Sequence, residues 1–349
     1  MLPPVRAIVW MSDRLRPVLR DRLMEATTVN SALEFWNARR DHQTVAFLDS
    51  TTITALTRAA VELHVTGDAV SPGPTIAICE EPLQTAVGWL GTHSWLSHVV
   101  SSAMLQHPLA GEHLGNVITT LTSGGRPRLL DWVGPTLAGR RVRMAHASRR
   151  EARLERMGEF FESQGVSSRT IQQLRDVAEE LLTNAFYDAP VSAGALSKPI
   201  SRTQDISLPD ESACDMVYGC REDLAVVRVR DPFGSLTRAR LVEVLLRCAR
   251  TDMGVQVDET MGGAGLGLWR IFSVATFVAI SVVDRRYTEF LVGIGKRPTG
   301  AAAARSAARP FAFHLFFREP SRTSRTTWKL LDPDTSAPTI NKSVTLAIE

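Results

Sequence analysis

The chain has 349 residues, of which 44% are hydrophobic, so it is long enough to form two domains with separate cores. Its 40 basic and 37 acidic residues give a net charge of +3, which is too balanced to favour a nucleic-acid partner. The four cysteines form no C-x-x-C pair, which argues against a zinc site or a disulfide framework.

The first part of the chain, residues 5–133, alternates short apolar runs with helical stretches. This alternation predicts a parallel α/β sheet. Helices are expected over Arg14–Ala26 and near Leu114–Thr122. The predicted strands are Arg6–Met11, Thr44–Asp49, Thr75–Cys79 and Ser97–Ser101.

In length and rhythm this part resembles a response-regulator receiver domain. Asp49 ends the second apolar run, where a receiver carries its phosphorylated aspartate. The acidic pair that the resemblance implies is reduced to Asp13, preceded by Ser12, and Ser101 begins the segment where a lysine is expected. We therefore expect a degenerate receiver-like domain, used for binding or for forming a homodimer. Asp49 is then either a phosphoacceptor or a cap at the end of its strand.

A second domain is predicted to begin near Gly134-Pro135, because glycine and proline interrupt the first pattern there. A strand over Arg141–Ala145 is followed by a helix from Ser148 to about Ser163 and a longer helix from Ser167 to Asp188. The basic cluster around the strand is interpreted as a solvated linker or a strand edge; its members are Arg140, Arg141 and Arg143.

The longer helix carries three polar residues at successive i,i+4 positions: Glu180, Asn184 and Asp188. Such residues share one helix face. A carboxylate and a carboxamide one turn apart provide the oxygen ligands that Mg²⁺ prefers. The alternative is a solvated polar stripe on an amphipathic helix.

Two further motifs follow in the chain. A strand pair over Cys214–Gly219 and Leu224–Arg230 leads to Asp231-Pro232-Phe233-Gly234, which places an aspartate at a strand end. The glycine run Gly263–Leu268 comes about thirty residues later and leads into a helical segment. It lacks the Lys-Ser/Thr of a P-loop and the third glycine of a dinucleotide fingerprint. A polar segment over Thr251–Met261 is suited to a mobile lid.

The order of these motifs resembles the GHKL ATP-binding fold shared by gyrase, Hsp90, histidine kinases and anti-sigma-factor serine kinases. Glu179–Ala185 is similar to the N box, Asp231–Gly234 to the G1 box and Gly263–Leu268 to the G2 box. With a closing hairpin over Ile280–Val283 and Thr288–Ile294, the resemblance implies an α/β sandwich with a mixed sheet and helices on one face. The expected domains are 1–133, 134–297 and a linker with a tail over 298–349.

The resemblance also implies roles for single residues. Asn184 would bind Mg²⁺, Glu180 would activate the attacking water or hydroxyl, and Asp231 would bind the adenine amino group of ATP. The remaining expected nucleotide contacts are Asp188, Phe233, Gly234, Gly263, Gly265, Leu266, Gly267, Leu268 and Thr288.

The chain departs from the GHKL pattern at the G1 box, where Phe233 and Ser235 replace glycines. Tyr187 and Asp188 stand where relatives carry Lys or His. The resemblance therefore implies an Mg-ATP-binding signalling protein that phosphorylates or gates a partner protein. The alternative is a non-catalytic ATP-dependent interaction switch. His146 is a poor phosphoacceptor candidate, because no two-helix hairpin precedes the ATP-binding region.

The ends of the chain carry less information. Pro310–Phe317 is apolar, and it is either a strand packed on one of the domains or an exposed docking segment. Residues 318–349 are rich in Ser, Thr and Pro, which suggests a tail. The start of the sequence lacks a signal-peptide pattern, and no apolar run approaches roughly 18 residues. We therefore expect a cytoplasmic protein without a membrane span.

Overall fold

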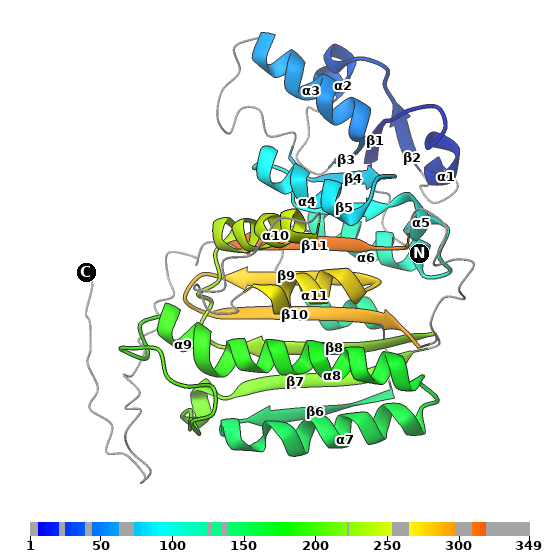
Figure 1. Cartoon of the computed structure of the whole chain (residues 1–349). Helices are drawn as coiled ribbons and strands as arrows, with labels where there is room; N and C mark the ends of the chain where they lie inside the picture. Colours follow the sequence, from blue (N-terminus) through cyan, green and yellow to red (C-terminus); the bar gives the residue numbers. More distant parts are fainter. Residues whose placement is uncertain are drawn as a thin grey trace. The chain divides into compact units, whose positions relative to one another are not determined.

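The computed structural model in Figure 1 describes residues 6–20, 25–38, 44–62, 73–123, 127–134, 138–221, 223–252, 265–296 and 309–318. The protein is mixed α/β, and the chain divides into two compact units. The first contains the chain up to Gly134 together with most of the late strand β11, and the second begins at Pro135. The division falls next to the boundary expected from the sequence.

The first unit is built on a parallel sheet in the order β2-β1-β3-β4-β5. This order is a common one for doubly wound α/β sheets. The central strands are apolar and completely buried, as expected for a sheet that is covered on both faces. The strands are β1 (Arg6–Trp10), β2 (Glu25–Thr28), β3 (Val45–Asp49), β4 (Thr75–Cys79) and β5 (His98–Ser101).

Helices connect these strands, and one sequence prediction fails here. The stretch Arg14–Ala26 was expected to be one helix, but of its described residues Arg16–Arg20 are helical, whereas Glu25 and Ala26 belong to β2 (Glu25–Thr28). Glu25–Thr28 carries two threonines, whose branched Cβ favours a strand. The helices are α1 (Arg16–Arg20), α2 (Ala32–Ala38), α3 (Ser50–Glu62), α4 (Leu83–Thr92), α5 (Ser102–Leu105) and α6 (Ala110–Thr122).

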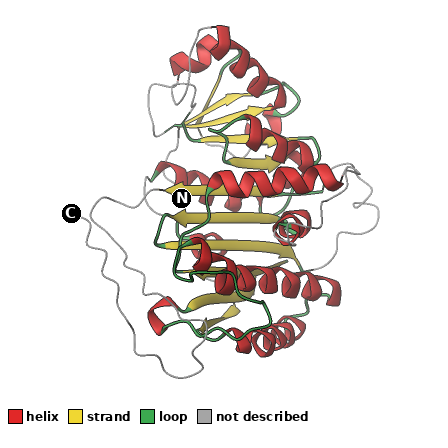
Figure 2. Cartoon of the chain, turned by 60° about the vertical axis from the view of Figure 1, so that its left-hand side comes forward, coloured by secondary structure: helices red, strands yellow, loops and turns green. Residues whose placement is uncertain are grey.

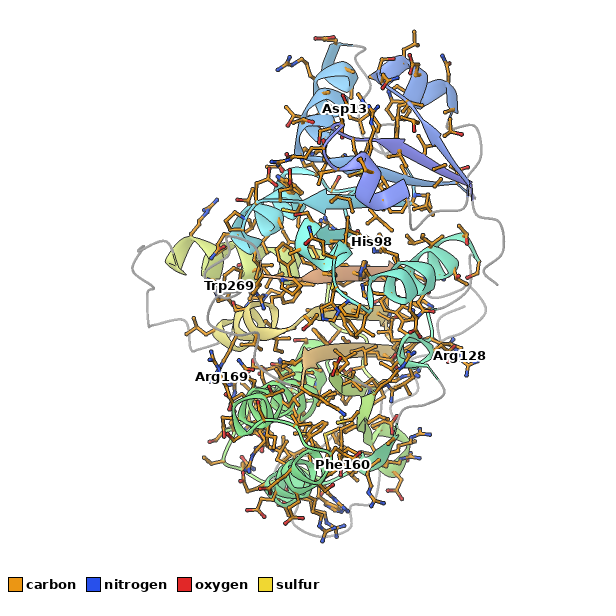
Figure 3. The ribbon with its side chains drawn as sticks, turned by 90° about the vertical axis from the view of Figure 1, so that its right-hand side faces the viewer. Asp13, His98, Arg128, Phe160, Arg169 and Trp269 are labelled. Carbon is orange, nitrogen blue, oxygen red and sulfur yellow. The ribbon has the colours of Figure 1, made fainter. Side chains whose placement is uncertain are left out.

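The late apolar segment forms strand β11 (Ala312–Arg318), so a packed strand is the alternative that the structure adopts. Ala312–His314 pairs antiparallel with β5. His314 packs there against His98 of β5 and His113 of α6, and the Nε2 atoms of His113 and His314 lie 2.9 Å apart. All three imidazoles are buried, and Figure 3 labels His98. β11 is thus tied to its neighbours by a buried histidine cluster as well as by backbone pairing.

The second unit is built on an antiparallel sheet in the order β9-β10-β8-β7-β6. The two strand pairs and the first strand expected from the sequence are all present. Each strand is somewhat longer than predicted, because the apolar alternation marks only the best-packed residues. The strands are β6 (Ala138–Met144), β7 (Cys214–Arg221), β8 (Leu224–Asp231), β9 (Phe277–Val283) and β10 (Tyr287–Gly295).

Helices α7 (Arg150–Ser163), α8 (Ser168–Thr183) and α11 (Leu266–Val274) lie on one face of this sheet, as Figures 1 and 2 show. α8 packs directly on β8 and β10, so its polar face reaches the ends of these strands. Ser167 caps α8 by accepting a hydrogen bond from the Thr170 amide. The unit also contains α9 (Ala189–Ser192) and α10 (Arg238–Asp252).

Within the described part of the chain, no helix combines the length and apolar character needed to cross a membrane.

Candidate functional site

A cavity of about 330 Å³ lies in the second unit, between the helices and the ends of β8 and β10. It brings together residues from the three separated sequence motifs. Glu180, Asn184 and Asp188 come from the first motif, Asp231 from the second, and Gly265 with Leu268 from the third. Thr288 and Phe290 of β10 complete this wall of the cavity.

The end of α8 is unusual in its backbone. Asn184–Asp188 forms a π-helical segment before α9 begins. Short π-helical segments within α-helices are frequent at functional sites. Glu180 and Asn184 remain neighbours, and the Asn184 amide donates to Glu180 Oε1 over 3.4 Å. The polar face predicted from the i,i+4 spacing therefore borders a cavity.

The two carboxylates of this face have altered acidity. Burial raises the pKa of Glu180, and the Arg202 guanidinium and the Asn184 amide oppose that change. Burial likewise raises the pKa of Asp188, which is paired with Arg202 at 3.2 Å. A half-buried glutamate with a raised pKa is a better base than an exposed one. Glu180 is therefore suited to accepting a proton inside the cavity.

Asp231 ends strand β8 and is buried. Its Oδ1 accepts hydrogen bonds from the amides of Phe233 at 2.8 Å and Gly234 at 3.4 Å, which fixes the orientation of the carboxylate. Burial raises the pKa of Asp231 to about 6 despite these bonds. Thr288 lies opposite Asp231 in the β8–β10 register, and its buried hydroxyl lies beside the carboxyl and helps to hold the pKa of Asp231 down. This corner offers a buried carboxyl beside a hydroxyl.

The glycine run forms the start of α11. Gly265 has φ +136°, a conformation that other residues rarely adopt, and it is the N-cap of the helix. Because the first amides of a helix lack intrahelical partners, this end attracts anions. At Gly267 a Cβ would lie 1.9 Å from the Glu180 carboxyl carbon, so glycine permits close contact between α11 and α8. Leu266 is exposed, whereas Leu268 lines the cavity.

Five predicted site residues do not line this cavity: Leu266 is exposed, Gly267 lies against Glu180, and the other three are Phe233, Gly234 and Gly263. Phe233 is fully buried and does not line the cavity. Gly234 has φ +61° and lies against the β9–β10 turn, where a Cβ would meet the Val283 carbonyl at 2.2 Å. Both support Asp231 through their amides and do not face the cavity. Gly263 lies outside the described residues, as does most of the expected lid over Thr251–Met261.

The sequence reasoning missed two basic residues of the cavity, Arg202 and Arg240. Arg202 pairs with Asp188, and Arg240 of α10 pairs with Glu243 over 3.1 Å. Both are isolated arginines in segments without a recognisable motif. Their sequence signal is weak, because surface arginines are common and only the fold brings these two to the cavity.

In the first unit, the sequence predicts Asp49 to be either a phosphoacceptor or a cap at the end of its strand. Asp49 is buried, and its Oδ2 accepts the Ser12 amide at 2.6 Å while Oδ1 accepts from Thr51 and Thr52. Burial opposes ionisation, but these hydrogen bonds outweigh it and lower the pKa of Asp49. Asp13 points into solvent and pairs with Arg16; Figure 3 labels it. Of the two alternatives, these hydrogen bonds agree with Asp49 as a cap at the end of its strand.

No family model matches this chain, and a search of curated proteins found no match either. Within the described residues, no group of three or more His, Cys, Asp or Glu side chains is arranged to hold a metal ion without further ligands.

Proposed function

We propose that this protein is an Mg-ATP-binding signalling protein of the GHKL class that phosphorylates or gates a partner protein. The observation that carries the proposal is the convergence of Glu180, Asn184, Asp231 and Gly265 on one cavity. These residues are spread over more than eighty positions of the sequence, and the resemblance assigns each a part in nucleotide binding. The cavity volume is near the lower end of the usual range for small-molecule sites.

The two ends of the cavity suit the two ends of a nucleotide. Asp231 and the Thr288 hydroxyl suit the amino edge of adenine, because a buried acceptor and a hydroxyl can hydrogen-bond to it. The α11 N-terminus, with Arg202 and Arg240, suits the phosphates, because amide dipoles and guanidinium groups stabilise negative charge. The described residues fit a nucleoside triphosphate better than an uncharged ligand.

Asn184 supplies a carboxamide oxygen for Mg²⁺ at the phosphate end of this arrangement, and Glu180 lies beside it as the proposed base. Mg²⁺ usually keeps several waters and binds through one or two protein ligands plus substrate phosphates, so one carboxamide oxygen is sufficient. Bound there, Mg²⁺ would neutralise charge that develops on the phosphate oxygens. Glu180 would accept the proton of the attacking water or hydroxyl, while the arginines hold the phosphates in place.

The first unit would then serve regulation and not phosphotransfer. Asp49 is engaged as a cap, and Asp13, the other acidic residue expected in a receiver-type site, points into solvent and pairs with Arg16. A degenerate receiver-like module suits binding of a regulatory partner protein or of a second copy of the chain. The ATP-binding unit would be the part that responds to nucleotide.

The alternative function, a switch that binds ATP without chemistry, is favoured by one contact. The start of α11 lies against Glu180 at Gly267, which restricts the space around the proposed base. In that case the cavity would bind ATP and change the affinity for a partner protein, and Glu180 would not be needed.

A Glu180→Gln variant separates the two functions. The kinase or ATPase function predicts a loss of turnover of roughly 10²- to 10⁴-fold with ATP affinity within a few-fold of wild type. Release of inorganic phosphate and transfer of label from γ-labelled ATP measure turnover, and calorimetric titration measures affinity. If wild type binds ATP but shows no turnover, the ATP-dependent switch without chemistry is the function that remains.

A further inference from the structure

A second cavity, of about 220 Å³, lies at the opposite face of the sheet of the second unit. Five arginines line it, together with the carboxylates of Asp215 and Asp231; they are Arg141, Arg143, Arg228, Arg230 and Arg286. We call it the arginine cavity. None of its arginines was assigned a function from the sequence, where Arg141 and Arg143 counted only as a basic strand edge.

The strand register explains how the arginines gather. Arg143 of β6 lies opposite Asp215 of β7, and Asp215 lies opposite Arg230 of β8. Arg230 in turn lies opposite Glu289 of β10. Residues directly opposite one another in a sheet share a face. Arg141 comes two residues before Arg143 in β6, and Arg228 comes two residues before Arg230 in β8. Both therefore lie on the same face, because side chains along a strand alternate between the faces with period two.

This face is the one turned away from the helices. Asp231 directly follows Arg230 in β8, and Thr288 directly precedes Glu289 in β10. Because successive side chains of a strand point to opposite faces, Asp231 and Thr288 point to the helix face and the nucleotide cavity. The arginine cavity is therefore separate from the nucleotide cavity. The two share only Asp231, at the end of β8, among their lining residues.

Part of the positive charge is used inside the protein. Arg228 is buried and pairs with both Asp215 and Glu289, and Arg141 also pairs with Asp215 at 2.8 Å. These ion pairs engage Asp215 and Glu289, which are the two carboxylates on this face. Even so, the buried Nε of Arg228 has no hydrogen-bond partner within the described residues. A buried unsatisfied donor beside a cavity is costly unless a ligand or water accepts from it.

Arg143 and Arg230 are not neutralised to the same degree. Arg143 donates to the Asp210 backbone carbonyl, which carries no net charge. Arg230 lies over the Tyr287 ring at 3.9 Å and is also 3.9 Å from Glu289, a carboxylate already shared with Arg228. Clustered guanidinium groups repel each other unless an anion lies between them. The cavity therefore combines a positive surplus with planar donors of the type that bind phosphate in pairs.

We propose that the arginine cavity binds the phosphate group of a small phosphorylated molecule, on the opposite face of the sheet from the nucleotide cavity. Its volume is below the usual range for drug-sized ligands, which favours one or two phosphate groups over a larger ligand. The proposal goes beyond the ATP-binding function and does not depend on it.

Calorimetric titration with sodium pyrophosphate, at low salt and in the presence of EDTA, tests this site. The variant Arg143→Gln/Arg230→Gln removes two charges from the cavity at exposed or half-buried positions, and leaves the buried Arg228 in place. The matched control Arg156→Gln/Arg169→Gln removes two exposed arginines from α7 and α8 that line none of the cavities described above; Figure 3 labels Arg169. Thermal melts establish that all variants are folded.

The expected result is pyrophosphate binding to wild type, at least tenfold weaker in the cavity variant and within about twofold of wild type in the control. No binding to wild type, or equal losses in both double variants, would overturn the proposal. An Arg202→Gln/Arg240→Gln variant removes the two arginines proposed for the phosphate end of the nucleotide cavity, and it should leave pyrophosphate affinity within about twofold of wild type. Loss of binding there, with retention in the cavity variant, would place the ligand in the nucleotide cavity instead. Binding of single-stranded DNA without pyrophosphate binding would also overturn it.

Discussion

At the scale of single residues, Asp231 carries the proposed specificity for adenine. Its burial raises its pKa to about 6, so the carboxyl is neutral below that pH and ionised above it. A carboxylate accepts a hydrogen bond from an amino group more strongly than a carboxylic acid does. ATP affinity should therefore rise as the pH increases through about 6 and level off above it.

The variant Asp231→Asn tests this prediction. We expect ATP affinity at pH 8 to fall roughly ten- to hundredfold, because a hydrogen bond to a charged group is lost. The pH dependence near 6 should also be weaker in the variant than in wild type. Titration of ATP itself is common to both proteins, so the difference between their calorimetric profiles isolates Asp231. Parallel pH profiles for the two proteins would contradict the assignment.

The Asp231 carboxyl, which is proposed to bind ATP, should also lower the stability of the folded protein. A carboxyl with a raised pKa binds its proton more tightly in the folded state, so this group makes folding less favourable as the pH rises from about 4 to 6. Asp231→Asn removes that unfavourable term and keeps an acceptor for the Phe233 amide. Without nucleotide at pH 8, the variant should melt at the same temperature as wild type or higher. A clearly lower melting temperature would show that the carboxylate is needed for folding.

At the scale of elements, strand β11 depends on the buried histidines. Burial lowers the pKa of His98 to about 3 and that of His113 to about 4, and it lowers the pKa of His314 well below its usual value. Below about pH 6.5 the unfolded chain takes up protons that the folded protein does not. The contribution of the three buried, neutral histidines to the stability of the folded protein is therefore complete above pH 6.5, and it is lost as the pH falls toward 4.

A His314→Leu variant should reduce this acid sensitivity, because one buried imidazole no longer has to stay neutral. We expect urea unfolding midpoints of wild type to fall between pH 7 and pH 5, and those of the variant to fall less. A His146→Leu variant is a suitable control, because His146 is only half-buried and bonds to Ser207 outside this cluster. Equal pH profiles for wild type and His314→Leu would contradict a role for the cluster.

The elements also show what a single sequence can and cannot predict. The strands of the second unit and its helices α7, α8 and α11 follow from apolar periodicity, glycine breaks and cap residues such as Ser167, whereas α9 and α10 were not predicted. β2 was missed, because four residues carry too little periodicity. The site followed from motif order, since Glu180, Asn184 and Asp231 belong to recognisable patterns. Arg202, Arg240 and the arginine cavity could not be predicted, because strand register and helix packing bring those residues together only in the folded protein.

At the scale of the whole molecule, nucleotide binding should affect the second unit and leave the first largely unchanged. The proposed site lies entirely in the second unit, and bound ligand stabilises the segments that contact it. Hydrogen exchange with and without Mg-ATP measures this. We expect slower exchange at Glu180–Asp188 and Leu266–Val274, with β3 and β4 unchanged. Protection confined to the first unit would place the nucleotide elsewhere.

The central claim is that one cavity of the second unit binds Mg-ATP through residues of all three motifs. Calorimetric titration of Mg-ATP into wild type, Asn184→Ala, Asp231→Asn and the Arg156→Gln/Arg169→Gln control tests it most directly. The account predicts binding to wild type and the control, and affinity at least tenfold weaker in each of the two site variants. Absence of ATP binding to wild type, or equal affinity in all four proteins, would contradict it.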